Sequence, residues 1–233
     1  MWLELFLCLL LAHLVADFVL QTDKICKNKI EKKWHSWWHY GHALIVVALS
    51  WLVVGDMDFW WYALVVGGTH FAIDMWKSYC KKNVIWFAID QLLHIAIVAG
   101  TALLWCSTNE WWCMPFEIQP KYIAMVCAII VCWKPANILI KLILKHYSVS
   151  TPNGQNESFN AGALIGNIER WLILIFIILQ RYDAIGLLIA AKSIIRFGDS
   201  QTQKSEYVLA GTLISIFIAV LAGLAVIRVS LIV

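Results

Sequence analysis

The feature that most constrains the fold of this chain is a series of apolar runs of about 20 residues, separated by short polar segments. Because a helix rises about 1.5 Å per residue, such a run covers the hydrocarbon core of a bilayer. The 233-residue chain is 61% hydrophobic and only 14% charged, which is unusual for a soluble globular domain. The runs are continuous rather than alternating, which excludes a transmembrane β-barrel. We therefore expect an all-α, polytopic transmembrane helical bundle.

The pattern predicts about eight spans. The N-terminal run has no basic n-region and no small-residue cleavage site, so we expect it to be the first span rather than a removable signal peptide. A turn-rich loop at 147–160 divides an N-terminal five-helix unit, 1–146, from a C-terminal three-helix unit, 161–233, within one membrane domain. The predicted spans are 2–21, 37–54, 59–79, 84–106, 122–144, 161–180, 184–196 and 207–232.

The distribution of lysine and arginine predicts the orientation of these spans. The loops after the first, third, fifth and seventh spans hold most of the basic residues, which favours placing those loops in the cytosol. Both termini are then non-cytosolic, unless the short seventh span is a re-entrant half-helix. The expected location is a bacterial inner membrane, with the lipid bilayer as partner. The small net charge of +3 is spread over loops and does not favour a nucleic-acid partner.

Histidine and aspartate recur inside the apolar runs, and the predicted topology places them at one depth, near the cytosolic side. His13 and Asp17, like His70 and Asp74, are four residues apart and so share one face of a helix. Ionisable groups are costly in a bilayer, so such residues face the bundle interior and usually mark function. The predicted metal ligands are His13, Asp17, His39, His42, His70, Asp74, Asp90 and His94.

Imidazole and carboxylate together suit a divalent metal such as Zn, Mn or Fe, in one or two ions. Asp90 or Asp17 could then act as general base. Other polar residues at the same depth are candidates for supporting the ligands or contacting substrate: Gln21, Lys77, Gln91, Glu169, Arg170, Lys192, Arg196 and Glu206. His35 lies in a polar loop, where an interfacial role is expected.

A structural interpretation stays open for each of these groups. A single His/Asp pair can be a buried hydrogen-bonded couple that holds helices together. The second-half charges can pair with one another or reach the interface. Alternatively, Lys192 and Arg196, one helical turn apart, can present donors to a phosphate or carboxylate.

The motifs HLVADFVLQ, HFAIDMWK and DQLLH, with His39 or His42 between the first two, resemble those of an uncharacterised bacterial integral-membrane family, a domain of unknown function. The family pattern is H-x3-D-F-x2-Q, H-x3-D-x2-K and D-Q-x2-H, and it covers roughly the first hundred residues. The segments GALIGNIER, AAKSIIRF and EYVLAGTLIS look like those of longer members. The resemblance implies no reaction. A looser likeness in layout exists to membrane-bound metal-dependent hydrolases.

The function that the sequence favours is a membrane-embedded, divalent-metal-dependent hydrolase. It would act at the cytosolic leaflet on an amphipathic substrate such as a phospholipid or isoprenoid phosphate. The alternative from another class is a metal-ion or proton-coupled transporter, which predicts polar residues continuing to the far leaflet. A third interpretation is a structural or partner protein whose polar residues only fix helix packing.

Overall fold

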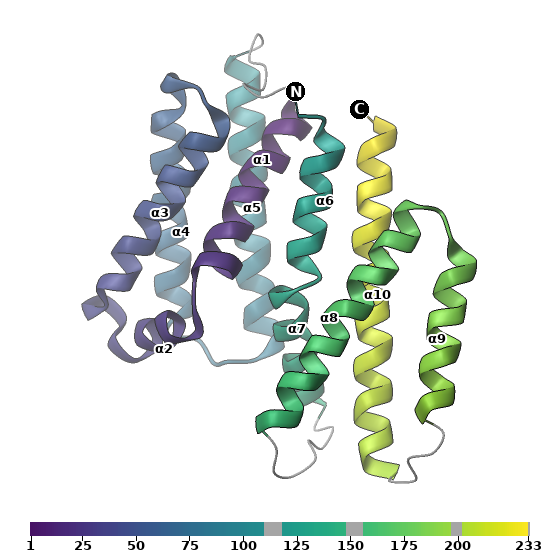
Figure 1. The fold of residues 1–233 in the computed structure, drawn as a ribbon. Coiled ribbons are helices and arrows are strands. Elements are labelled where there is room, and N and C mark those ends of the chain that lie inside the picture. The colour runs from purple at the N-terminus through teal and green to yellow at the C-terminus, as the bar shows by residue number, and fades with distance from the viewer. Residues whose placement is uncertain (110–117, 148–155, 197–201, 233) are drawn as a thin grey trace. The chain divides into compact units, whose positions relative to one another are not determined.

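The computed structural model describes residues 1–109, 118–147, 156–196 and 202–232, without the side chains of 156–161, 195–196 and 202–207. These residues form ten α-helices and no strand, which confirms the predicted all-α class (Figure 1). The helices make two compact units, Met1–Ile130 and Val131–Val233. Of the loop predicted at 147–160, residues 148–155 lie outside the described residues, and a helix begins at Asn156.

The first unit is a bundle of antiparallel helices. α1 (Trp2–Leu14) packs against α3 (Trp37–Val54) and α5 (Val84–Thr108), and α4 (Trp60–Lys77) packs against α3 and α5. α6 (Pro120–Val131) begins in the same unit. Between α1 and α3 the chain forms α2 (Asp23–Lys32), a short polar helix at one end of the bundle, where the sequence predicted only a basic loop (Figure 1).

Local chemistry explains where several of these helices begin and end. Thr22 caps α2 by accepting a hydrogen bond from the Ile25 N–H, and Asn83 caps α5 by accepting one from the Trp86 N–H. α3 ends at Gly55, whose positive φ of 66° is the left-handed conformation that glycine adopts without strain. The following turn is closed by Asp56, which accepts from the Asp58 N–H.

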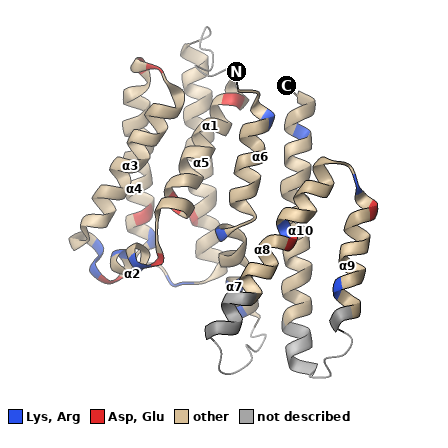
Figure 2. Ribbon diagram, in the orientation of Figure 1, with Lys and Arg blue, Asp and Glu red and all other residues tan. Residues whose placement is uncertain are grey.

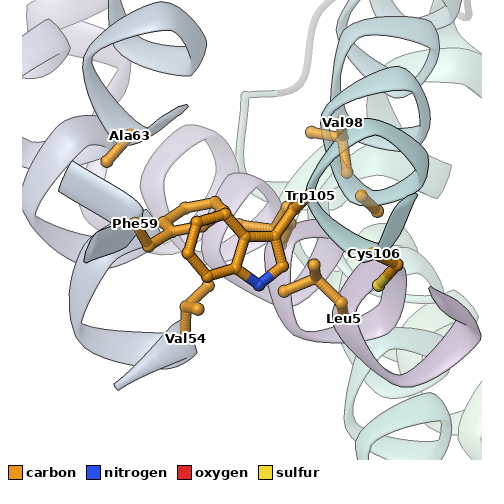
Figure 3. Packing of buried hydrophobic residues seen from close by; sticks show 9 residues of the cluster. Leu5, Val54, Phe59, Ala63, Val98, Trp105 and Cys106 are labelled. Carbon is orange, nitrogen blue, oxygen red and sulfur yellow. The ribbon is translucent and has the colours of Figure 1, made fainter. Parts of the chain in front are cut away.

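An apolar cluster packs one end of the first unit. It joins the start of α1, the end of α3, the start of α4 and the end of α5 through buried side chains, including Leu5, Val54, Phe59 and Trp105 (Figure 3). The Phe59 and Trp105 rings meet edge to face with centroids 5.2 Å apart. This end fixes the four helices together and leaves their opposite ends to the polar residues.

The second unit contains α7 (Lys134–His146), α8 (Asn156–Ile178), α9 (Tyr182–Arg196) and α10 (Thr202–Ile232). α10 packs against α8 and α7, and α9 packs against α8. Cys132, Ile173, Ile177 and Ala219 form its buried apolar cluster.

Four helical segments among the described residues are long and apolar enough to cross a membrane: Trp2–Leu20, Trp37–Val54, Val84–Thr108 and Val208–Ile232. α6 and α7 add a fifth if they form one broken span. An integral membrane protein is therefore supported, but the predicted eight spans are not. α4 is as long as α3, yet His70, Asp74 and Lys77 lower its mean hydropathy. The 15 residues of α9 are too few to cross.

Candidate functional site

Histidine and aspartate side chains from four helices gather in the first unit, at the end opposite the apolar cluster. Figure 2 shows the charged residues of α2, α4 and α5 toward this end of the bundle. Three overlapping groups, each with ligand atoms within 4.8 Å of one another, are His13–Asp17–His94, Asp17–His42–His70 and His70–Asp74–His94. We call the six residues the His/Asp cluster: His13, Asp17, His42, His70, Asp74 and His94.

The centre of the His/Asp cluster is a compact set of four atoms. The His42 Nε2 lies 3.0 Å from the Asp17 Oδ1 and 3.0 Å from the His70 Nε2, and the His70 Nε2 lies 3.3 Å from the Asp17 Oδ1. The Asp74 Oδ2 lies 3.8 Å from both nitrogens. Ligand atoms about 2.0–2.1 Å from a tetrahedral zinc ion lie about 3.3 Å from one another. We call the residues that carry these four atoms the inner set: Asp17, His42, His70 and Asp74. Their spacing suits one divalent cation.

When Asp17 is ionised, protons alone do not satisfy the three central atoms of the inner set, which are the Asp17 Oδ1 and the Nε2 atoms of His42 and His70. A ring nitrogen either donates one hydrogen or accepts one, and an ionised carboxylate only accepts. If both nitrogens donate to Asp17, the two N–H groups of His42 and His70 oppose each other at 3.0 Å. If only one of the two nitrogens carries a hydrogen, the lone pair of the other nitrogen points at a lone pair of the Asp17 carboxylate. A cation between the three atoms would remove this conflict.

Asp17 owes its position to a change in helix type. After Leu14 the chain continues as a π-helix over Val15–Leu20, and the Gln21 N–H donates to the Ala16 carbonyl across five residues. Such segments are rare and occur mostly at functional sites. The π-segment holds Asp17 against α3 and α4, so that its nearest partners are His42 and His70. Its contact with His13, which the sequence predicted, is longer, at 4.0 Å.

His94 and His13 each present an unpaired ring nitrogen beside the inner set. The Nδ1 of His94 lies 2.9 Å from the Asp90 main-chain carbonyl, which can only accept, so this nitrogen carries the hydrogen. The His94 Nε2 is then a lone-pair donor, and it is buried with no partner, as is the His13 Nε2. A backbone carbonyl that fixes the tautomer in this way is typical of metal-binding histidines.

A small cavity adjoins these imidazoles. His13, His70 and His94 line one part of it, and the rest is mostly apolar, from α3, α4 and α5. The cavity has room for about one water molecule.

Lys29 belongs to the site and was not singled out from the sequence. It is only 5% exposed, and its Nζ donates to the Asp74 Oδ2 at 2.5 Å. α2 turns Ile25, Cys26 and Lys29 toward the bundle, since positions three and four apart share a helix face. The sequence contains that spacing, but the spacing places Ile25, Cys26 and Lys29 on one face only if residues 23–32 form a helix. Burial also raises the pKa of the Cys26 thiol, which donates to the Gln21 Oε1.

Two predicted ligands lie outside the His/Asp cluster. Asp90 is fully buried, and its carboxylate accepts from the Lys77 ammonium and from the Gln91 amide at 2.9 Å. His39 is buried against Phe71, with ring centroids 6.2 Å apart and neither ring nitrogen paired. The structure thus brings His42, and not His39, into the His/Asp cluster, and it places the Asp90 main-chain carbonyl beside His94.

The predicted polar residues of the second half belong to the second unit. The Lys192 ammonium donates to the Glu169 carboxylate. Arg170 is buried and donates to the Cys132 carbonyl, to the Ser215 hydroxyl and to the side-chain oxygens of Asn137 and Asn167. Arg196 lies at the end of α9 and Glu206 in α10, but their side chains are outside the described residues.

Comparison with known proteins gives a family and nothing closer. No curated protein and no solved structure matches the chain. The family model described as "Protein of unknown function (DUF3307)" matches residues 5–121, from α1 to the start of α6. This match covers the whole His/Asp cluster together with α2, Lys77 and Asp90. The chain therefore belongs to the DUF3307 family of proteins of unknown function.

Proposed function

We propose that the protein is a membrane-embedded, divalent-metal-dependent hydrolase that acts at the cytosolic leaflet on a phosphate-bearing amphipathic substrate. The observation that carries the proposal is the inner set, in which Asp17, His42, His70 and Asp74 converge from α1, α3 and α4 with the spacing of metal ligands. Mixed imidazole and carboxylate ligands suit Zn, Mn or Fe.

The energetics of burial support a cation in this place. Asp17 and Asp74 are nearly buried, and Lys29 supplies one positive charge to the inner set. Uncompensated charges in the interior of a bundle cost several kcal/mol each. One negative charge then remains, which a divalent ion that carries a hydroxide would neutralise, and the ion would occupy lone pairs of the two imidazoles as well.

The cavity beside His13, His70 and His94 supports hydrolysis rather than a purely structural ion. A catalytic metal keeps one position for water, and the cavity has room for about one. A bound divalent ion lowers the pKa of such a water toward neutrality, which supplies the nucleophile. Asp17 is engaged in the inner set and Asp90 with Lys77, so neither is a free general base.

The surroundings suit an anionic, amphipathic substrate. Around α2, Lys24, Lys27 and Lys32 are exposed, together with Trp34 and Trp37. Basic and aromatic side chains of this kind gather at the headgroup level of a membrane, and most strongly on the cytosolic side. We infer that α2 faces the cytosol and that the N-terminus lies outside it, in a bacterial inner membrane.

The test is metal content and turnover of the purified full-length protein in detergent. We expect at least one divalent ion per chain, and chelator-sensitive release of phosphate from phosphatidic acid or an isoprenyl diphosphate in mixed micelles. Asp74→Asn and His70→Ala should each lower both by at least about tenfold, since each removes a ligand. His35→Ala is the matched control, because His35 is exposed. Metal content and turnover that are unchanged in both ligand variants would contradict the proposal.

The burial of the His/Asp cluster supports a second function, which is transport of a metal ion or proton. Every histidine of the His/Asp cluster is at most 5% exposed, and α2 covers the cluster through Lys29. Flux of Zn²⁺ or Mn²⁺ into proteoliposomes, lost in His70→Ala and unaccompanied by phosphate release, would favour the transporter over the hydrolase.

A further inference from the structure

The inner set leaves part of the His/Asp cluster unused. His13 and His94 are each 3% exposed, and the Nε2 atom of each has no hydrogen-bond partner. Their rings lie nearly parallel, with centroids 5.0 Å apart and an interplanar angle of 23°. Leaving a buried polar atom unpaired is unfavourable, so two such atoms in neighbouring rings indicate a ligand that both can bind.

Asp17 connects these two imidazoles to the inner set. Its Oδ1 faces His42 and His70 at 3.0 and 3.3 Å, whereas its Oδ2 lies on the side of His13, 4.0 Å from the Nδ1 of that ring and not beside its unpaired Nε2. His13, Asp17 and His94 form one group of potential ligands and Asp17, His42 and His70 form another, while a third group joins His94 to His70 and Asp74. The first two groups share only the carboxylate of Asp17. One carboxylate with its two oxygens turned to two groups is the arrangement that bridges a pair of metal ions.

We propose that the centre is dinuclear: a second divalent cation binds His13 and His94 and is bridged by Asp17 to the ion of the inner set. This inference rests on the proposed function, because it presupposes the first ion. Ions in such pairs lie about 3.5–4 Å apart and clamp the attacking and leaving oxygens of a displacement. The cavity is lined by His13 and His94, which would hold the second ion, and by His70, which would hold the first, so it offers a place for a water molecule near both.

The charge of a dinuclear centre specifies the class of substrate. Two divalent ions and the Lys29 ammonium face only the Asp17 and Asp74 carboxylates, since Asp90 is neutralised by Lys77. The centre therefore carries an excess of positive charge that hydroxide and a further anion must balance. A phosphate or diphosphate headgroup, with several anionic oxygens, meets this requirement better than a carboxylic ester.

The experiment is a titration of the metal-free, full-length protein with Mn²⁺, followed by equilibrium dialysis and electron paramagnetic resonance. We expect two ions per chain and, at full loading, the spectrum of a spin-coupled pair. His94→Gln and His13→Gln should each bind one ion and give the spectrum of isolated Mn²⁺. His39→Gln is the matched control: it is an equally buried histidine with unpaired nitrogens, outside the cluster, and should keep two coupled ions.

The outcomes separate this inference from the proposed function. One uncoupled ion in the wild type, unchanged by His94→Gln and His13→Gln, overturns the dinuclear centre and leaves a mononuclear hydrolase. No bound ion in the wild type overturns both. Size-exclusion profiles identify a variant that has not folded, and in that case the spectrum of the loaded wild type decides alone, as coupled or uncoupled.

Discussion

Lys29 is the residue that most directly modulates the inner set. Its ammonium occupies the Asp74 Oδ2, which is also one of the four atoms spaced for a metal ion. A lysine in this position holds the site together when no ion is bound, and it competes with the ion for one oxygen. Its positive charge also opposes a bound cation.

Replacing Lys29 by methionine should therefore tighten metal binding. We expect the dissociation constant for Zn²⁺, measured by competition with a chromophoric chelator, to fall by about tenfold or more, because a charge and a competitor are removed together. Lys27→Met is the control, since Lys27 lies on the exposed side of the same helix and pairs with Glu31 at 3.8 Å. An unchanged or larger constant in Lys29→Met would show that Lys29 does not compete with the ion.

At the scale of residues, regular helix spacing predicted part of the site and misled in another part. His70 and Asp74 do lie on one face and reach the same partners, as a four-residue spacing implies. Asp90 and His94 have the same spacing, but the Asp90 carboxylate accepts from Lys77. The hydrogen bond of the His94 Nδ1 goes to the Asp90 main-chain carbonyl, and the carboxylate is farther from this nitrogen, at 3.7 Å. The π-segment at Asp17 could not be predicted, because tertiary packing and not local sequence selects it.

Among the elements, the contact between α3 and α4 sets the geometry of the cluster. Gly67 lies one turn before His70, and a Cβ at this position would meet the Val47 Cγ2 at 2.2 Å and the Ala43 carbonyl oxygen at 3.2 Å. The two helices that carry His42 and His70 approach this closely only because residue 67 has no side chain. The neighbouring Gly68 has open space around it.

This difference gives a matched pair of substitutions. Gly67→Ala should force α3 and α4 apart, lower the free energy of unfolding in detergent by about 1–3 kcal/mol and weaken metal binding. Gly68→Ala should leave metal binding unchanged and stabilise the helix by about 0.5–1 kcal/mol. Thermal unfolding with and without added Zn²⁺ measures both effects. Equal behaviour of the two variants would mean that the close approach does not position the site.

The sequence predicted that the elements are helices, but it predicted less well which of these helices span a membrane. Apolar runs identified α1, α3 and α5, but α2 was expected to be a loop because its lysines hide the inward face of Ile25 and Cys26. α4 shows the converse difficulty. It packs between helices that can span a membrane, while its own site residues lower its hydropathy below that of a span. In α4, polar residues of the proposed site lower the mean hydropathy, so a count of spans by hydropathy leaves this helix out.

For the whole molecule, the division into two units separates the polar residues that the sequence had grouped together. The His/Asp cluster lies within Met1–Ile130, and the family match at 5–121 covers the same region. Arg170 and the Glu169–Lys192 pair have their own partners within Val131–Val233. The proposed metal chemistry therefore belongs to the first unit, and Arg170 joins α8 to α7 and α10 through its hydrogen bonds.

The central claim is that histidine and aspartate side chains from four helices bind a divalent metal. X-ray absorption at the metal edge of the purified, full-length protein tests it most directly. We expect a first shell of nitrogen and oxygen only, at about 2.0–2.1 Å, with the outer-shell scattering of several imidazoles, and loss of that scattering in a His42→Ala/His70→Ala double variant. Protein purified without bound metal and unable to take up Zn²⁺, Mn²⁺ or Fe²⁺, or a first shell containing sulfur, would contradict the account.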